Sequence, residues 1–417
     1  MSDNDPLTAQ INSGLAAVPK GALGVAVSGG SDSVALLRLL CNWGHAQGRK
    51  IYAATVNHNL RAEAQDEAEF VANLCRKLDV PHQILSWDNW DGRGNLQSAA
   101  RDARKVLLTD WAQKLGLKSV AIGHTQDDQA ETFLLRLARG SGVDGLSGMQ
   151  KISGNNPVWV RPMLGITRMD LRDYLSDLSQ SWVEDPSNQD QKYDRVKMRN
   201  AMPVLAELGL TSERLANTAH GLQSARAALD EATQNAARKC CTLDAYGTVA
   251  IDLEKLQPCA LDIQYRVISH AMKWVTGAKY RPRFEALKSV YALLRQGKSQ
   301  TLAGCYIKTS KHEQIIVMRE IANMKPIALE TGCFDGRWQI SADTALQNTD
   351  IRPLGEKGLQ QLKNWRELGI SRDILMQSPA AWQDNTVIAA PLAGFSGPVT
   401  ISLKIHPDQF YFDIVSH

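Results

Sequence analysis

The chain has 417 residues, which is too long for one ordinary hydrophobic core and predicts two or three domains. Hydrophobic residues make up 44% of it and charged residues 22%, the balance of a soluble globular protein. A formal net charge of +3 excludes a strongly basic chain that would attract nucleic acid over its whole surface. Any binding of RNA must therefore come from local basic patches.

The sequence has no feature typical of a membrane or secreted protein. Its apolar runs all fall short of the about 20 residues that span a bilayer. Its first ten residues lack the basic and apolar regions of a secretory signal. The seven cysteines are dispersed without a CxxC pair, which predicts a reducing, cytoplasmic location and argues against a zinc or iron–sulfur site. We expect no membrane partner.

The first half alternates short apolar runs with amphipathic helical patterns. The helical patterns cover residues 64–78 and 96–115, and the predicted strands cover residues 23–27, 51–56, 82–85 and 119–123. This βαβα order predicts an α/β fold with a doubly wound parallel sheet and helices on both faces. Ligands bind at the carboxyl ends of such strands, and polar loops follow three of the four predicted strands.

The second half has a different pattern. Its predicted elements are one long alanine-rich helix, two further helices and a hairpin, over residues 211–239, 261–275, 284–294, 301–307 and 314–319. After Pro326 the chain has short strand-like runs separated by turn signals. We therefore expect an α/β domain, a mainly helical domain and a small α+β domain, over residues 1–210, 211–326 and 327–417.

The first predicted strand leads directly into the sequence SGGSDS, residues 28–33, and then into a helical pattern. Gly29 and Gly30 let the backbone turn tightly and approach a ligand, while Ser31 and Asp32 stand where the helix begins. Free N–H groups and the positive end of the helix dipole would then face a phosphate. No GxxxxGK[ST] motif occurs here, and an acid in place of its lysine makes sense if Asp32 holds Mg²⁺. A turn that only caps the helix is the alternative interpretation.

A second motif, GHTQDDQAET, begins at the end of the fourth predicted strand. It places Asp127, Asp128 and Glu131 in the first turns of a helix, with Asp128 and Glu131 three residues apart on one face. The helix dipole stabilises acids there, so capping alone would explain one of them. Three acids beside Gly123 and His124 favour a polar wall of the cleft that binds a metal ion or an ammonium group.

Two stretches resemble known families. SGGSDS resembles the PP-loop of the N-type ATP pyrophosphatases, which cleave ATP to AMP and pyrophosphate. Residues 123–149, GHTQDDQAETFLLRLARGSGVDGLSGM, are similar nearly residue for residue to the signature of tRNA(Ile)-lysidine synthetases, and so are residues 161–164 and 184–190. The four glycines within residues 140–148 predict a loop rather than a helix there.

Two basic segments are also compared with this family: one resembles its ARxxR segment, and the other, residues 193–200, departs from its RNxIRH pattern but keeps two arginines. Arg195 and Arg199 are spaced i, i+4, which places two guanidinium groups on one helix face, and Arg101 and Arg104 stand in an ARxxR segment. The resemblance implies a catalytic role for Arg195 and contacts with tRNA or pyrophosphate for Arg101, Arg104 and Arg199. Without the resemblance, solvated basic faces would explain both pairs.

The chain departs from the family pattern at residues 57–61, which read NHNLR. His58 matches, but Asn59 stands where the family commonly has a glycine. Asparagine adopts positive φ less freely than glycine, so the backbone geometry of this loop is open.

The resemblance implies a substrate and a reaction. The substrate would be the isoleucine tRNA with anticodon CAU, whose wobble cytidine becomes lysidine. ATP would first adenylate the base carbonyl oxygen and release pyrophosphate. The ε-amino group of L-lysine would then attack the activated ring carbon and expel AMP. The target base would have to be splayed out of the anticodon loop into the pocket.

The resemblance also implies roles for single residues. ATP would be bound by Ser28, Gly29, Gly30, Ser31, Asp32, Ser33, His58, Gly123 and His124. The catalytic residues would be Asp32, Asp127, Glu131 and Arg195, with Mg²⁺ on Asp32 and Asp127 and the lysine ammonium on Glu131. The attacking amine must be neutral, and His58 and His124 are the candidates for its base.

Residues 279–283, KYRPR, interleave cations with an aromatic ring. This composition suits stacking on bases and contact with phosphates of RNA. A linker between two helices would explain the same residues equally well.

Two other functions stay open at this point. A PP-loop tRNA sulfur transferase would share the ATP site but typically needs a catalytic cysteine or a CxxC-bound metal, and Cys41 and Cys75 fall inside apolar helical patterns. A non-catalytic nucleotide-binding or RNA-binding module on the same fold would not need the acids Asp32, Asp127 and Asp128. The sequence leaves the oligomeric state open, a homodimer included.

Overall fold

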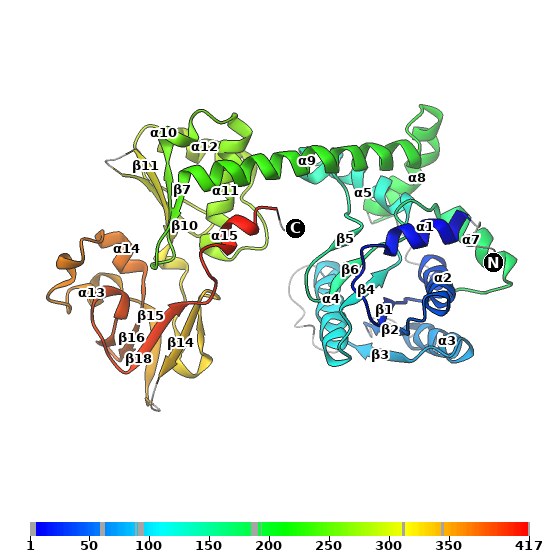
Figure 1. The fold of residues 1–417 in the computed structure, drawn as a ribbon, viewed down its shortest axis with the longest axis horizontal. Coiled ribbons are helices and arrows are strands. Elements are labelled where there is room, and N and C mark those ends of the chain that lie inside the picture. Colours follow the sequence, from blue (N-terminus) through cyan, green and yellow to red (C-terminus); the bar gives the residue numbers. More distant parts are fainter. Residues whose placement is uncertain are drawn as a thin grey trace. The chain divides into compact units, whose positions relative to one another are not determined.

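A computed structural model describes residues 6–58, 63–87, 90, 96–184, 191–192, 194–310, 313–342 and 346–415. The chain divides into two compact units, residues 1–226 and 227–417 (Figure 1). Helix α9 (Ser212–Cys240) crosses the boundary between them. Within the described residues, no helix is both long and apolar enough to cross a membrane. Residues 59–61 of the predicted loop and residues 185–190 of the segment similar to the family signature lie outside the described part.

The first unit is built on a six-stranded sheet with the order β3-β2-β1-β4-β6-β5. The strands are β1 (Leu23–Ala26), β2 (Ile51–Asn57), β3 (His82–Ser86), β4 (Ser119–Ile122), β5 (Ile152–Ser153) and β6 (Val158–Val160). β1 pairs in parallel with β2 and β4, β2 with β3, and β4 with β6, while β5 is antiparallel. The predicted α/β class and its four strands are confirmed.

Helices cover both faces of this sheet. They are α1 (Pro6–Leu15), α2 (Ser31–Ala46), α3 (Glu63–Lys77), α4 (Leu96–Lys114), α5 (Gln126–Ala138), α6 (Val143–Leu146), α7 (Arg168–Asp177) and α8 (Asp194–Glu207). Side chains of β1 alternate between two hydrophobic cores, as the period of a strand requires. Leu23 and Val25 belong to the core with α1, α2, α3 and α7, whereas Ala26 belongs to the core with Trp111 of α4. The sheet is therefore doubly wound.

Gly24 lets α4 pack closely on β1. A Cβ atom at this position would lie 2.8 Å from Cζ3 of Trp111 and 3.2 Å from a methyl group of Leu117, and both side chains are buried. Gly24→Ala is therefore expected to lower the free energy of unfolding by about 1–3 kcal/mol through overpacking, measured by urea denaturation. Gly221→Ala is the control, because nothing lies within 4 Å of its Cβ position in α9. Equal stability of Gly24→Ala and the wild type would contradict this packing.

The glycine-rich segment after α5 differs from its prediction. Residues 143–146 form the short helix α6 instead of a loop. The turn is stabilised because Arg136 Nη1 donates to the carbonyl oxygens of Gly145 and Gly148, at 2.6 and 3.1 Å, which satisfies acceptors that end a helix. The Gln129 side chain also pairs with both backbone polar groups of Met149. Side chains of α5 thus hold the segment that sequence pattern alone describes as irregular.

The second unit begins with a five-stranded antiparallel sheet of order β7-β8-β11-β10-β9. Its elements are α9, β7 (Cys241–Leu243), β8 (Val249–Asp252), α10 (Leu253–Leu256), α11 (Leu261–Thr276), α12 (Phe284–Leu294), β9 (Gln300–Leu302), β10 (Cys305–Thr309) and β11 (Gln314–Arg319). The predicted helices are present. The first predicted strand of the hairpin, residues 301–307, is divided into β9 and β10. Ala303 and Gly304 form a two-residue turn between them, and both have positive φ, 48° and 77°.

The C-terminal part consists of two small sheets with short helices. The strand orders are β12-β15-β16-β17 and β13-β14-β18. The elements are β12 (Ile327–Ala328), β13 (Cys333–Phe334), β14 (Trp338–Ala342), β15 (Thr349–Pro353), α13 (Gly355–Leu359), α14 (Arg372–Gln377), β16 (Pro379–Gln383), β17 (Thr386–Ala389), β18 (Val399–Leu403) and α15 (Gln409–Phe412), with 3₁₀ turns at Ile321–Asn323, Leu329–Thr331, Trp365–Leu368 and Pro391–Ala393. This agrees with the expected small α+β architecture.

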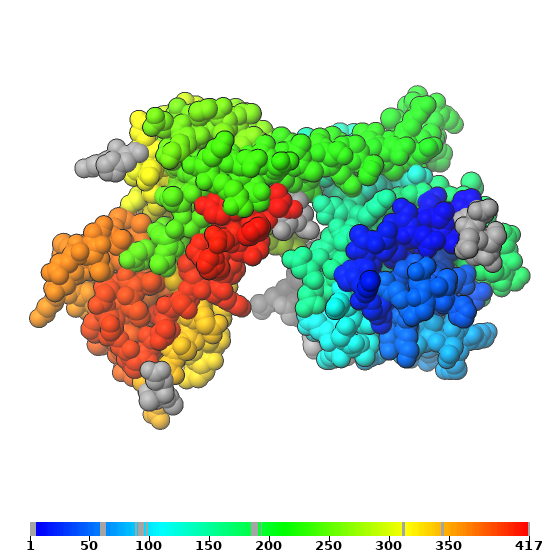
Figure 2. Space-filling view, viewed as in Figure 1, coloured from blue at the N-terminus to red at the C-terminus, as the bar shows by residue number. Residues whose placement is uncertain are grey.

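The end of the chain returns to the helical part of the second unit. Phe410 is fully buried in the core formed by α9, α11 and α12, and Gln234 of α9 donates a hydrogen bond to the carbonyl oxygen of Tyr411 at 2.8 Å. Figures 1 and 2 show the red C-terminal segment against the green of α9. Removing residues 327–417 as one block would therefore also open this core. The division of the chain at residues 210 and 326 stays a prediction.

Candidate active site

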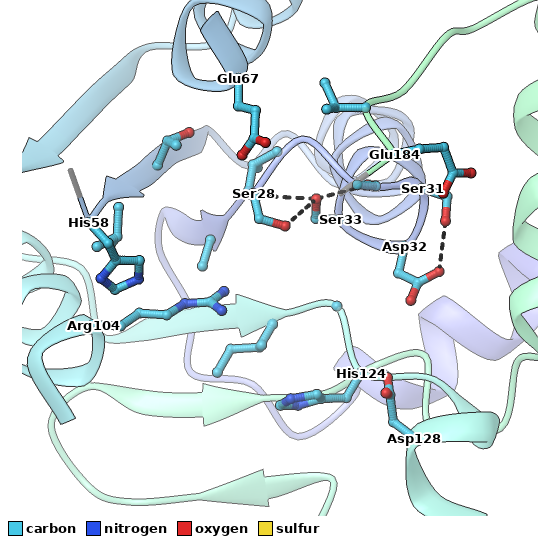
Figure 3. A pocket seen from close by; sticks show the side chains of 18 of the residues that line it. Ser28, Ser31, Asp32, Ser33, His58, Glu67, Arg104, His124, Asp128 and Glu184 are labelled. Carbon is cyan, nitrogen blue, oxygen red and sulfur yellow. Dashed lines mark hydrogen bonds between the residues drawn. The ribbon is translucent and has the colours of Figure 1, made fainter. Parts of the chain in front are cut away.

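A cavity of about 1150 Å³ opens at the carboxyl ends of three parallel strands. Ser28 follows β1, His58 follows β2 and His124 follows β4, and all three line the cavity (Figure 3). β1 lies between β2 and β4, where the strand order reverses. Open α/β sheets bind their ligands at such a switch point. The predicted position of the cleft is thus where the cavity lies.

The loop after β1 forms a tight turn. Gly29 has a φ of 93°, a conformation that favours glycine. The Ser33 hydroxyl accepts the N–H of Ser28 at 3.1 Å and donates to the carbonyl oxygen of Gly30 at 3.0 Å, which fixes the turn. Gly30, the N-cap of α2, provides no side-chain cap. The first N–H groups of α2 therefore receive no cap from Gly30. They lie at the positive end of the helix dipole.

The end of β4 approaches this loop closely. A Cβ atom on Gly123 would lie 3.2 Å from the carbonyl oxygen of Asp32. Glycine is thus needed where the two motifs meet. His124 follows at once, and the hydroxyl of Thr125 then accepts the N–H of Asp128 while the Asp128 carboxylate accepts the N–H of Thr125, which caps α5.

One guanidinium group lies among three carboxylates of the cavity wall. Arg168 Nε is 3.3 Å from Asp32 Oδ2, Nη2 is 3.4 Å from Asp128 Oδ1 and Nη1 is 3.5 Å from Glu131 Oε1. These carboxylates raise the pKa of Arg168, although its burial acts in the opposite direction. Arg168 therefore supplies the positive charge that balances this group of acids in the ligand-free protein.

Asp32 and Asp128, two of the acids that line the cavity, respond differently to their surroundings. Burial raises the pKa of Asp32, an effect that Arg168 opposes and Asp128 reinforces. Burial also acts to raise the pKa of Asp128, but Arg195, His124 and the N–H of Thr125 outweigh it, so this pKa is lowered. Asp128 is thus held ionised, whereas the ionised form of Asp32 is disfavoured until a further cation approaches it.

Asp127 does not belong to the cavity lining. Its Oδ2 accepts the backbone N–H of Arg168 at 2.7 Å, and its Oδ1 accepts the hydroxyl of Ser212 at 3.2 Å. The first interaction satisfies a free N–H at the start of α7, and the second ties the start of α9 to α5. Asp127 thus holds the backbone at Arg168 by a hydrogen bond, whereas Asp128, the next residue, lines the cavity.

Glu131 lies below the cavity wall and is 1% exposed. Its Oε1 is 2.9 Å from Nε of Arg199, and its Oε2 is 3.1 Å from Nε of Arg195 without a hydrogen bond. Both arginines line the cavity, and they project from one face of α8, as their spacing predicts. The buried carboxylate of Glu131 thus holds Arg195 and Arg199 at the edge of the site, and one of its oxygens has no hydrogen bond.

Comparisons with known proteins identify the family of the chain. Residues 4–208 match the family described as PP-loop domain. The tRNA(Ile)-lysidine synthase of Ruegeria pomeroyi is 40% identical over 403 residues, 96% of both chains. The chain belongs to the tRNA(Ile)-lysidine synthase family. The member from Wolbachia pipientis wMel is 33% identical over 397 residues, 91% of both chains. The U34-tRNA thiolase NcsA of Methanococcus maripaludis covers 52% of this chain and 76% of its own at a TM-score of 0.46 and 16% identity.

The two histidines that line the cavity of this family member are both neutral bases with lowered basicity. Burial lowers the pKa of His58, and Arg104 adds to the effect. Burial also lowers the pKa of His124 to about 3, although Asp128 opposes this. The Nδ1 atoms of both rings are buried without a hydrogen-bond partner. Both rings line the cavity (Figure 3).

Most of the residues predicted from the family resemblance line the cavity. They are Ser28, Gly30, Ser31, Asp32, Ser33, His58, Arg104, Gly123, His124, Arg195 and Arg199. Four others are not part of the lining, namely Gly29, Arg101, Asp127 and Glu131. The sequence interpretation missed Arg168. The pattern Thr167-x-x-Asp170, which forms a capping box in the structure, could have predicted the start of α7 there.

Proposed function

We propose that this member of the tRNA(Ile)-lysidine synthase family joins L-lysine to the wobble cytidine of the isoleucine tRNA with anticodon CAU, at the expense of ATP. The family membership makes it an ATP-dependent ligase. The observation that carries the proposal is one cavity that combines an uncapped phosphate-type loop, a row of arginines and a pair of carboxylates. Adenylation of a base followed by attack of an amine needs each of these groups.

The loop of residues 28–33 would bind the phosphates of ATP. Its N–H groups stand at the positive end of the α2 dipole, and a phosphate there replaces the missing cap. Arg104, Arg195 and Arg199 line the same cavity and would stabilise the charge on pyrophosphate as it leaves. Base adenylation makes the cytosine carbonyl oxygen a good leaving group, because AMP then departs instead of oxide.

The residues fit a magnesium ion held jointly by protein and nucleotide. Mg²⁺ usually takes one or two carboxylates together with phosphate oxygens. Asp32 and Asp128 face one cation, Arg168, between them. No three His, Cys, Asp or Glu side chains converge as a closed metal site within the described residues, which suits shared coordination. We propose Asp32 as the main ligand and Asp128 as its partner in place of Asp127, because Asp128 lines the cavity and Asp127 does not. The ion would neutralise charge on the transferred phosphoryl group.

The acidic side of the cavity would receive the lysine. Asp128 is held ionised, and Glu131 keeps one oxygen without a hydrogen bond. That oxygen of Glu131 already lies 3.1 Å from Nε of Arg195, so a lysine ammonium would have to displace this arginine to reach it. We keep Glu131 as a proposed lysine acceptor and add Asp128, which lines the cavity. The amine must lose a proton before it attacks. A pKa of about 3 makes His124 a poor proton acceptor, so His58 is the better candidate for the base.

The sulfur transferase alternative is disfavoured by the state of the cysteines. None of the described residues that line the cavity is a cysteine. Burial raises the pKa of Cys41 to about 11 and that of Cys75 to about 12, so both thiols stay protonated at neutral pH. A protonated thiol is a poor nucleophile.

Pyrophosphate release tests the proposed function. ATP, lysine and the CAU tRNA together should release pyrophosphate and incorporate labelled lysine into the tRNA. Omission of the tRNA should abolish pyrophosphate release, because the base is the group that becomes adenylated. Pyrophosphate release that continues without tRNA, or that occurs without incorporation of lysine, would contradict the proposal. The methionine tRNA with the same anticodon serves as the control substrate.

A further inference from the structure

Residues 279–284, KYRPRF, form a basic and aromatic surface outside the catalytic cavity. They connect α11 to α12 in the second unit. Tyr280 is 74% exposed, and Phe284 is 54% exposed. Two large aromatic rings in contact with water within five residues are unusual for a chain that buries most of its aromatic side chains. The segment is therefore more than a linker.

Phe284 is held against buried aromatic side chains, and Tyr280 contacts the neighbouring Lys279. Phe284 lies edge-on against Tyr265, with ring centroids 5.3 Å apart, and Tyr265 in turn contacts Tyr291 at 5.5 Å. The inner rings, Tyr265 and Tyr291, are buried, so Phe284 rests on a fixed support. Lys279 Nζ lies 5.4 Å from the ring centroid of Tyr280. A preorganised ring loses little entropy when a flat partner stacks on it.

Positively charged side chains predominate around these rings. Residues 279–298 contain six Lys or Arg and one acid, Glu285, whereas the whole chain is nearly balanced at 47 Lys or Arg and 44 acids. Arg283, Lys288, Arg295 and Lys298 are exposed in the structure. Gly277 ends α11 with a φ of 65°, and α12 begins at Phe284, so the basic segment is presented in a short connection between two packed helices (Figure 1).

We infer that the surface formed by residues 279–298 binds RNA by stacking an unpaired base on Tyr280 and contacting the flanking phosphates with Arg283 and its basic neighbours. RNA combines flat, exposed base faces with closely spaced negative charge, which matches exposed rings among cations. The inference rests on the proposed tRNA substrate and assigns it a second contact, made outside the anticodon loop.

Binding to two RNAs separates this surface from the catalytic cavity. The full-length chain is titrated with complete CAU tRNA and with its isolated anticodon stem-loop, in the absence of ATP and lysine. Tyr280→Ala should raise the Kd for complete tRNA about tenfold, the loss of one base–aromatic stack, and leave the Kd for the stem-loop within twofold. Tyr280→Phe should restore binding, because it keeps the ring. Arg283→Ala should lower the slope of log K against log salt by about 1.

Lys404→Ala is the matched charge control, because Lys404 is exposed in the same unit and outside the proposed surface. It should leave both Kd values within twofold of the wild type. Unchanged binding of complete tRNA by Tyr280→Ala would overturn the inference, and so would an equal loss for both RNAs. Binding of phosphatidylserine vesicles that is lost in Tyr280→Ala, with tRNA binding unchanged, would assign the surface to membranes instead. A wild-type chain that binds tRNA through Tyr280 but forms no lysidine would refute the proposed function and leave this surface standing.

Discussion

Asp32→Asn should reduce pyrophosphate release and lysidine formation by about 10²–10³-fold, the loss expected for one electrostatic partner of a transferring phosphoryl group. Asp32 stands at the start of α2, lines the cavity and is the acid proposed to hold Mg²⁺. Asparagine keeps the size of the side chain and removes its charge. Steady-state rates with the CAU tRNA at saturating ATP measure the effect.

The same variant should not lose stability. Burial raises the pKa of Asp32, so the folded protein holds the ionised form less well than the unfolded chain does. At neutral pH the charge of Asp32 therefore costs folding free energy, and its removal should leave Tm unchanged or raise it. A low rate together with a lowered Tm would indicate misfolding and contradict this account.

Asp110→Asn provides the matched control for this variant. Asp110 is an exposed acid on α4 that does not line the cavity. The control should keep the rate of the wild type. If Asp32→Asn retained more than about a tenth of the rate, the proposed role in phosphoryl transfer would be wrong, since such groups contribute more than tenfold.

The sequence predicted the strands and the phosphate loop because both depend on local pattern. The apolar run at residues 23–27 predicts a buried strand, and the glycines of SGGSDS predict a tight turn after it. Gly29 has the positive φ that the pattern suggests, and the Arg195 and Arg199 pair lies on one helix face. Features that a few consecutive residues determine were therefore accessible from the sequence.

Contacts between distant segments were not accessible in this way. Asp127 and Asp128 are adjacent and chemically alike, and their roles differ because α7 and α9 place Arg168 and Ser212 beside Asp127. No spacing in the sequence indicates that Arg168 meets Asp32, 136 residues earlier in the chain. The glycine-rich segment after α5 is similar, because its short helix depends on the side chain of Arg136.

Arg168→Ala should lower the free energy of unfolding by about 3 kcal/mol, since it removes the ion pair of Asp32 and leaves Asp128 and Glu131 with only Arg195 and Arg199 among the described residues. Asp32, Asp128 and Glu131 each lie within 3.5 Å of this guanidinium. Arg168 acts to lower the pKa of Asp32 and of Asp128, so without it both pKa values must rise. The loss of stability should therefore be largest at neutral pH and should shrink as the pH falls and the carboxylates bind protons. Urea denaturation at several pH values measures both effects.

Arg172→Ala is the matched control for Arg168→Ala. Arg172 lies one turn further along α7, also lines the cavity and pairs with Glu184 at 2.9 Å, but both partners of that pair are largely exposed. An exposed ion pair contributes about 0–1 kcal/mol, so this variant should change stability little. Arg168→Lys should recover only part of the loss, because one ammonium group cannot reproduce contacts made by three guanidinium nitrogens. Equal destabilisation by Arg168→Ala and Arg172→Ala would show that Arg168 does not balance the acids of the site.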